Sequence, residues 1–282
     1  MLDGSRATGR LQRAEGRAHV AFAAAPGGAR LTGLHQSGCA KAMLPRSPGR
    51  VPEAVFLNTS GGLTAGDRLT FSLDLAAGAR AVGTTQTAER AYASLEGPAA
   101  DVRTDLSLAS GASLDWLPQE TILFERAAMA RRTRAELAPG ARLLMVETLV
   151  LGRAAMGEVL RNVRLLDRRE VVRGGVPLWI DPVEIGAEAL ARAGDPALFG
   201  GDRAFSTVAL IADGAEDGLG PARDALAGVT RDGHGVRAVA SAWNGRLVAR
   251  LAAPDAFPLR RALRSLFATL RGGAPMPRVW QD

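Results

Sequence analysis

A pattern of strand, Gly-Ala turn and strand occurs three times in the first half of the sequence, and it constrains the fold more than any other feature. The turn glycines are Gly78, Gly111 and Gly140, within the runs Leu73-Asp-Leu-Ala-Ala-Gly-Ala-Arg-Ala, Leu106-Ser-Leu-Ala-Ser-Gly-Ala-Ser-Leu and Leu137-Ala-Pro-Gly-Ala-Arg-Leu. A unit of about thirty residues cannot bury its apolar face alone, so such units stack on one another. The pattern predicts an all-β architecture of hairpins in series.

Short apolar or alternating runs, bounded by Gly, Pro, Asp or Asn, support the same fold class. In Leu69–Leu75 the apolar residues occupy every second position, which places them on one face of a strand. We expect further strands at His19–Ala23, Ala54–Asn58, Ala81–Gln86, Val102–Leu108, Ser113–Leu117 and Arg142–Val150.

Two segments predict helices instead of strands. Pro221–Leu226 can open a short helix, and a clearer one follows Asp255, which suits the cap position. In the second helix one apolar stripe is formed by Leu259, Leu263, Leu266, Phe267 and Leu270. The stripe can pack on the protein's own sheet or dock a partner, and the sequence leaves both alternatives open.

Length and cysteine content fit one cytoplasmic domain. The chain has 282 residues, of which 47% are hydrophobic, enough for a real core. We expect a single domain over 1–282, with 1–18 flexible. No apolar run approaches the roughly 20 residues that cross a bilayer, and the N-terminus lacks the apolar part of a signal peptide. Cys39 is the single cysteine, so an intrachain disulfide is excluded.

The formal net charge of +6 comes almost entirely from arginine, since Lys41 is the lone lysine. The arginines are spread along the chain and are not interleaved with aromatic residues, as nucleic-acid stacking platforms require. A coding bias toward arginine explains them more simply than a nucleic-acid surface does. An acidic protein partner is a third explanation. We therefore expect no nucleic-acid partner.

Sequence signatures of common enzymes are missing. The chain has no GxxxxGK[ST] loop, no HExxH pair, no CxxC and no GxSxG elbow. Gly61-Gly-Leu-Thr-Ala-Gly66 resembles a phosphate-binding loop, but a strand pattern follows it where a helix would be needed. Turn geometry explains these glycines equally well.

Several motifs in a fixed order resemble those of the urease accessory protein UreD (UreH) family. They begin with Leu57-Asn-Thr-Ser-Gly-Gly-Leu-Thr-Ala-Gly-Asp67, which has the family's N-x-x-G-G-x-x-x-G-D turn. The later motifs are Thr84-Thr-Gln-Thr-Ala-Glu-Arg-Ala-Tyr92, Leu114-Asp-Trp-Leu-Pro-Gln-Glu-Thr-Ile-Leu-Phe124, Glu147-Thr-Leu-Val-Leu-Gly-Arg153, Met156-Gly-Glu158 and Pro277-Arg-Val-Trp280. The resemblance covers most of the chain from Ala54 onward. It is weaker over Leu34–Pro45, Asp195–Asp202 and Gly214–Gly220.

The resemblance implies a mainly β, helically wound sheet structure with about two α-helices, one of them near the C-terminus. It also implies a maturation factor without catalytic activity. Such proteins form a complex with UreF and the GTPase UreG, dock on apo-urease and assist nickel insertion into its active site. The resemblance therefore implies no tightly bound cofactor, with nickel only in transit.

The family is thought to conduct nickel along an internal polar path, and Asp67, Thr85, Glu120 and Glu147 match motifs near it. We predict that Asp67 and Glu147 contribute metal contacts, because each is an acid within an otherwise apolar β motif. Glu120 is included on its match to the family motif. The alternatives are structural: Asp67 can accept backbone amides at its turn, and Glu147 can pair with Arg153 or another arginine.

Other candidate residues carry weaker arguments. His35 and Cys39 are close enough in sequence to chelate a metal, but such a pair is usually incidental. Glu89, Arg90 and Tyr92 suit turn or surface roles. A different class of function stays open, a small-molecule-binding or hydrolytic enzyme that uses Asp67, Glu120 or Glu147 as paired acid and base.

Overall fold

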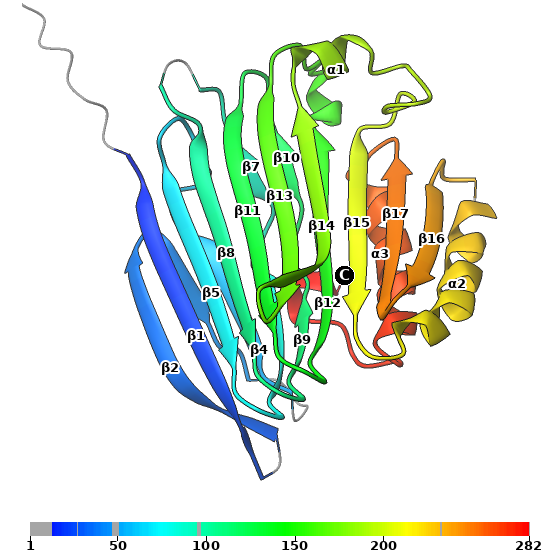
Figure 1. The fold of residues 1–282 in the computed structure, drawn as a ribbon. Coiled ribbons are helices and arrows are strands. Elements are labelled where there is room, and N and C mark those ends of the chain that lie inside the picture. The colour runs from blue at the N-terminus through cyan, green and yellow to red at the C-terminus, as the bar shows by residue number, and fades with distance from the viewer. Residues whose placement is uncertain (1–12, 27, 47–50, 95–96, 232, 282) are drawn as a thin grey trace, which may run out of the picture.

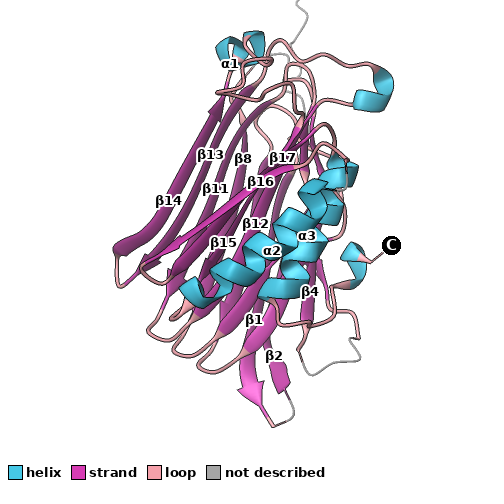
Figure 2. Cartoon of the chain, turned by 90° about the vertical axis from the view of Figure 1, so that its right-hand side faces the viewer, coloured by secondary structure: helices cyan, strands magenta, loops and turns pink. Residues whose placement is uncertain are grey.

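Two β-sheets packed face to face, with helices outside one of them, form the structure (Figures 1 and 2). The computed structural model describes residues 13–26, 28–46, 51–94, 97–231 and 233–281. Strands dominate and the helices are few, so the predicted fold class is confirmed.

One sheet has seven strands in the order β14-β13-β11-β8-β5-β1-β2. Neighbours from β1 to β13 are parallel, while β2 and β14 are antiparallel edge strands. The strands are β1 (Glu15–Ala25), β2 (Gly28–Gly38), β5 (Arg68–Leu75), β8 (Ala100–Leu108), β11 (Ala128–Leu137), β13 (Arg164–Arg173) and β14 (Val176–Ile185).

The other sheet has ten strands, with the main order β16-β17-β15-β12-β9-β6-β4-β3; off this order, β10 pairs with β12, and β7 pairs with β10. Its strands are β3 (Ala40–Met43), β4 (Glu53–Asn58), β6 (Arg80–Thr85), β7 (Glu89–Ala91), β9 (Ser113–Trp116), β10 (Thr121–Leu123), β12 (Arg142–Leu151), β15 (Ala204–Ile211), β16 (Arg237–Trp243) and β17 (Arg246–Ala253).

The chain winds between the two sheets, because β5, β8 and β11 belong to one sheet and β6, β9 and β12, which follow them, belong to the other. The predicted Gly-Ala turns make these crossings. Gly78, Gly111 and Gly140 all have φ between 66° and 70°, and the amide of Gly78 donates to the carbonyl of Ser110 on the next turn. The thirty-residue sequence repeat is thus the wound-sheet repeat. The units are not the predicted hairpins, because the two strands that each turn joins lie in different sheets and pair in parallel with strands of neighbouring units.

Apolar side chains form two buried cores that share the ten-stranded sheet. The first lies between the sheets and includes the alternating inward residues of β5, Leu69, Phe71, Leu73 and Leu75. The second lies between the outer face of the ten-stranded sheet and the helices α2 (Leu219–Arg231) and α3 (Ala256–Leu270) (Figure 2).

Helix α3 confirms the predicted C-terminal helix, and the carboxylate of Asp255 accepts the amide of Phe257 at 2.8 Å as its cap. The whole apolar stripe is buried in the second core, which favours packing on the protein's own sheet over partner docking. The other predicted helix is present as α2, and a short α1 (Ala187–Ala191) was not predicted. None of the helices within the described part of the chain is long and apolar enough to cross a membrane.

One backbone carbonyl joins the wound sheets to the helical layer. The carbonyl of Leu117 accepts the Thr84 hydroxyl at 2.6 Å, from 33 residues away. It also accepts the indole Nε1–H of Trp280 at 2.8 Å, from 163 residues away. Trp280 is buried and packs edge-on against Phe267 of α3.

The flexible segment expected over 1–18 extends too far into the fold. Strand β1 begins at Glu15, and it pairs with β2 on one side and β5 on the other. Ala18 is buried in the first core. The expected strand began only at His19, so this burial was not predicted from the sequence. Residues 1–12 of the expected segment lie outside the described residues.

Candidate functional site

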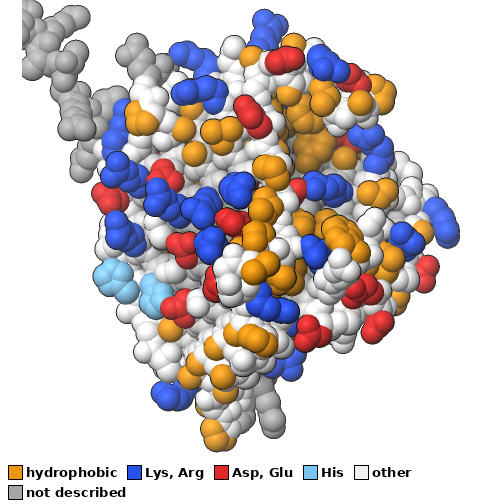
Figure 3. Space-filling model, in the orientation of Figure 1, with side chains coloured by type: hydrophobic (Ala, Val, Ile, Leu, Met, Phe, Trp, Pro, Cys, Tyr) orange, Lys and Arg blue, Asp and Glu red, His pale blue; other side chains and the backbone are white. Residues whose placement is uncertain are grey.

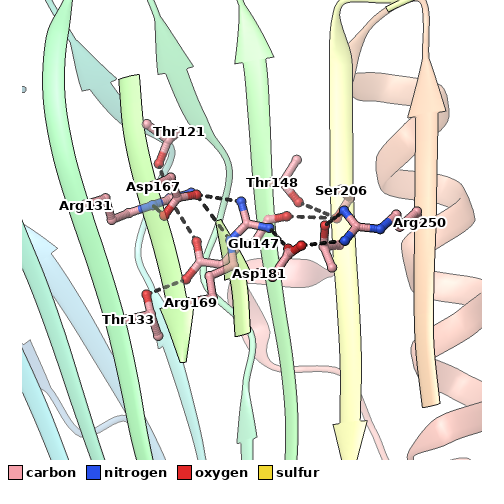
Figure 4. Close-up of polar contacts among 11 residues, drawn as sticks. Thr121, Arg131, Thr133, Glu147, Thr148, Asp167, Arg169, Asp181, Ser206 and Arg250 are labelled. Atoms are coloured by element: carbon pink, nitrogen blue, oxygen red, sulfur yellow. Dashed lines mark hydrogen bonds and ion pairs between the residues drawn. The ribbon is translucent and has the colours of Figure 1, made fainter. Parts of the chain in front are cut away.

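Glu147 lies on β12 with its side chain buried between the two sheets (Figure 4). Its Oε2 is 2.8 Å from Nη1 of Arg131 on β11, and its Oε1 accepts the Thr133 hydroxyl at 3.1 Å. The expected arginine partner therefore exists, but it is Arg131 from the facing sheet and not Arg153. Arg153 pairs with Glu158 at the surface.

A chain of ion pairs continues from Arg131 across the interior. Arg131 donates Nε and Nη2 to Asp167 on β13 at 3.0 and 2.6 Å, in a two-pronged contact. Arg169 contacts Asp167 at 2.5 Å and Asp181 on β14 at 2.8 Å. Arg250 on β17, whose side chain is 55% exposed, closes the chain on Asp181 from the surface. Three carboxylates thus face three guanidinium groups, and we call these six residues the buried ion-pair chain because the other five are buried.

Hydroxyl groups add to this chain on both sides of the ten-stranded sheet. Between the sheets, Thr121 accepts from Nη1 of Arg131 at 3.0 Å. On the helix-facing side, Thr148 and Ser206 bond each other at 2.9 Å, because each alternates with the inward-facing Glu147 and Thr207. The Ser206 hydroxyl also donates to the backbone carbonyl of Glu147 at 3.3 Å. The apolar interior of this region is therefore interrupted by a continuous polar belt that runs from one sheet to the other (Figure 4).

The two central carboxylates have pKa values that move in opposite directions. Burial raises the pKa of Glu147, and Arg131 offsets this only in part. Burial also acts to raise the pKa of Asp167, but the combined attraction and hydrogen bonds of Arg131 and Arg169 outweigh it, so that pKa lies below its ordinary value. Asp167 is therefore held firmly as a carboxylate, and the charged form of Glu147 is less stabilised than that of Asp167.

Glu147 also lines two separate cavities. The first, about 110 Å³, lies on the side of Arg131, Thr121 and Thr85, and reaches the loop around Gly61 and Glu89. The second, about 410 Å³, lies on the side of Arg169 and Arg250, and is otherwise walled mainly by Leu149, Val183, Phe199, Phe205 and Leu251. The buried ion-pair chain is thus the polar wall at which the two cavities meet.

The first cavity contains polar groups that lack protein partners. Among the described residues, Trp116 Nε1 and Gln119 Nε2 are buried donors without an acceptor, and both residues line this cavity. Buried donors of this kind are normally satisfied by ordered water. The first cavity therefore provides a hydrated, polar environment next to Glu147.

Glu89 stands near the outer end of the first cavity and was not expected there. Its carboxylate accepts the Asn58 side-chain amide at 3.3 Å and the Arg90 backbone amide at 3.0 Å. Burial raises its pKa. Glu89 is half-buried and accepts from Asn58 of the Gly-rich turn, which is compatible with the predicted turn or surface role. The sequence signal that could have predicted this position is an acid just after the Thr84-Thr-Gln-Thr run, whose Thr85 also lines the cavity.

Asp67 and Glu120 are not among the residues that line either cavity. Asp67 is buried and accepts the backbone amides of Ala14 and Thr64, both at 2.8 Å, so it fixes the Gly-rich turn to the first strand. Glu120 lies between Gln119 and Thr121, which both line the first cavity. Metal contacts by Asp67 and Glu120 stay a prediction without support from this geometry.

No three His, Cys, Asp or Glu side chains in the described ranges gather closely enough to hold a metal ion. His35 lies on β2 opposite His19 of β1, while burial raises the pKa of the Cys39 thiol. A thiol with a raised pKa is a poor thiolate ligand. The site can therefore offer a cation the oxygens of Glu147, Glu89 and nearby hydroxyls, which bind divalent ions weakly.

Comparison with known proteins agrees with the motif resemblance. A family model described as UreD urease accessory protein matches residues 14–281. The chain is 53% identical over 272 residues to a urease accessory protein UreD of Cereibacter sphaeroides, covering 96% of both chains. Its identity to the protein of the same name from Jannaschia sp. is 49% over 281 residues, covering 100% of both. For Rhizobium leguminosarum bv. trifolii it is 42% over 271 residues, covering 96% of both.

Proposed function

Because the chain belongs to the UreD family of urease accessory proteins, we propose that it serves urease maturation as a chaperone and scaffold without catalytic activity. In this proposal it acts with UreF and UreG, docks on apo-urease and helps to insert nickel. The family membership supports the link to urease maturation. The proposal places this work in the cytoplasm, which suits a chain whose single cysteine excludes an intrachain disulfide.

The nickel ion, as cargo, is proposed to pass through the interior at Glu147. The observation that carries this proposal is that Glu147 lines both cavities. Weak oxygen ligands suit a protein that passes a metal onward, because a deep binding site would retain the ion. Glu89 supplies a second carboxylate near the outer end of the first cavity.

The buried ion-pair chain then sets the resistance to passage. Its three arginines and three acids balance, so a dication gains no net attraction from the chain as a whole. The charged form of Glu147 is less stabilised than that of Asp167, and Glu147 lines both cavities, so its carboxylate is the one suited to leave Arg131 and contact the ion. Asp167 keeps Arg131 in place through two hydrogen bonds.

The test is nickel-dependent urease activation with UreF, UreG and apo-urease, comparing wild type with Glu147→Gln. The substitution keeps the size of the side chain and removes its charge, so activation should fall by roughly tenfold or more. Glu136→Gln, on the outward face of β11 with a 44% exposed side chain, is the matched control and should activate normally. Normal activation by Glu147→Gln, with the complex still formed in a pull-down, would refute passage at Glu147.

The same pull-down tests the scaffold role. Stable association of the wild-type chain with UreF, UreG and apo-urease is the expected result, and lack of association would refute it. The enzyme alternative requires a free acid and base, whereas both oxygens of Glu147 are engaged by Arg131 and Thr133. No observation favours that alternative over the scaffold role.

A further inference from the structure

Three arginines stand side by side on the outer face of the seven-stranded sheet, the face opposite the cavities. Arg103 of β8 pairs in register with Arg132 of β11, and Arg132 pairs with Arg168 of β13. Each alternates with buried neighbours, so all three side chains point outward. We call them the arginine row. Lys and Arg side chains gather on this part of the surface in Figure 3.

Such a row opposes the stability of the sheet. Neighbouring strands lie about 4.8 Å apart, and like charges directly opposite each other are destabilising. An isolated sheet would be more stable with alternating charges in each row. The register instead places three positive groups together, although the adjacent row contains Asp105 and Glu170.

The carboxylates on this face compensate the row only partly. Asp101 forms an ion pair with Arg103 at 2.8 Å. Glu170 is shared by three arginines, Arg132 at 3.4 Å, Arg134 at 3.5 Å and Arg168 at 3.8 Å. Arg134 also contacts Glu136 at 3.3 Å. One carboxylate offers about four acceptor positions, whereas each guanidinium has about five N–H donors. Arg132 and Arg168 are 53% and 50% exposed and therefore direct unused donors outward.

Apolar side chains border the row on the β13–β14 side. Leu166, two positions before Arg168 on the same face, is 56% exposed, and Ile180, opposite Glu170 on β14, is 40% exposed. The outward positions of β8, β11 and β13 include no aromatic residue on which a nucleic-acid base could stack. A positive row with an apolar border matches protein more closely than nucleic acid.

We propose that the arginine row binds an acidic protein segment that carries apolar residues along one side. Carboxylates of the segment accept the unused donors of Arg132 and Arg168 in the two-pronged geometry that guanidinium favours. Its apolar residues cover Leu166 and Ile180. The surface lies outside the buried site, so this proposal does not depend on nickel passage.

The test measures binding of a labelled short peptide rich in Glu and Leu to the full chain by fluorescence anisotropy. Two further probes are the same peptide with Gln for Glu, and a DNA duplex of equal net charge. The double variant Arg132→Glu/Arg168→Glu is compared with Arg30→Glu/Arg231→Glu, a pair of exposed arginines on β2 and at the end of α2. Both variants change the net charge equally, so general electrostatic attraction is controlled.

The acidic peptide should bind wild type and the control pair, and the row variant should lose at least about tenfold in affinity. Binding should weaken with salt, and the Gln peptide should bind poorly. Equal loss in both variants would overturn the proposal, and so would tighter binding of the duplex than of the acidic peptide. Arg132→Gln/Arg168→Gln, which introduces no repulsion, repeats the test if the reversed variant does not fold.

Discussion

Strands β11 and β13 place arginine and acid on both of their faces, and the two faces use them in opposite ways. Inside, Arg131, Asp167 and Arg169 belong to a chain with equal numbers of positive and negative groups (Figure 4). Outside, one step along each strand, Arg132 and Arg168 share Glu170 with Arg134. The period of two in a strand separates a neutral polar belt from a surface on which three arginines stand in one row.

Solvent explains why the two faces differ. A buried charge without a partner is strongly destabilising, so the inner groups must be matched one to one. An exposed arginine keeps its water, so imbalance there is tolerated and stays available for a partner. Arginine and acid therefore stabilise the fold on the inner face and are available to bind a partner on the outer face.

The largest effect on stability is expected for Asp167→Asn on the inner face. The substitution leaves Arg131 and Arg169 without their shared carboxylate in the interior, so the free energy of unfolding should fall by about 3–5 kcal/mol. Denaturant unfolding at neutral pH measures the loss. A loss below about 1 kcal/mol would mean that the inner face behaves like a surface.

The pH dependence of the same variant gives an independent check. The pKa of Asp167 is lowered in the folded state, so its stabilisation is present above the unfolded value of about 3.9 and is lost as pH falls through the lower folded value. The stability difference between wild type and Asp167→Asn should therefore be largest above this range and shrink below it.

Glu147→Gln should show the opposite pH dependence and a smaller effect. Burial raises the pKa of Glu147, so between the unfolded value of about 4.3 and the higher folded value the folded state holds more protons. Wild type consequently loses stability as pH rises through this window, and the glutamine variant does not. Unfolding curves across this range should show that the stability of the variant rises relative to wild type as pH rises. A difference in the free energy of unfolding that stays constant with pH would contradict the raised pKa of Glu147.

The smallest stability change is expected outside. Glu170→Gln removes the carboxylate that three surface arginines share, and it should alter the free energy of unfolding by less than about 1 kcal/mol. Because the row becomes more positive, the acidic peptide should bind more tightly to this variant. Weaker peptide binding would show that Glu170 organises the row instead of neutralising it.

The fold could be predicted because its signals are local. Alternation in Leu69–Leu75 and the turn glycines are read from adjacent residues, and the cap at Asp255 marks the start of α3. The sequence also singled out Glu147 as an acid within an apolar run. Its partner could not be identified, because Arg131 comes from the facing sheet and depends on how two sheets align.

The other residues of the site could not be predicted for the same reason, although the sequence contained one signal for two of them. In β13, Asp167 and Arg169 occupy the same alternate positions as the buried Leu165 and Val171, which marks them as inward-facing charges. Asp67 was predicted to contact the metal as an acid within an apolar β motif, whereas the structure shows the alternative hydrogen bonds to backbone amides at its turn. The arginine row depends on the register of strands about thirty residues apart, which no short motif encodes.

The carbonyl of Leu117, which accepts one hydrogen bond from Thr84 and one from Trp280, bears on the order of folding. The first bond closes a loop of 33 residues and the second a loop of 163. Loop-closure entropy grows only with the logarithm of length, so the longer loop costs only about 1.4 kcal/mol more. Long-range pairing slows folding far more than it weakens the folded state. We therefore expect the bond of Trp280 to form later in folding than the bond of Thr84, at little extra cost in the free energy of the folded state.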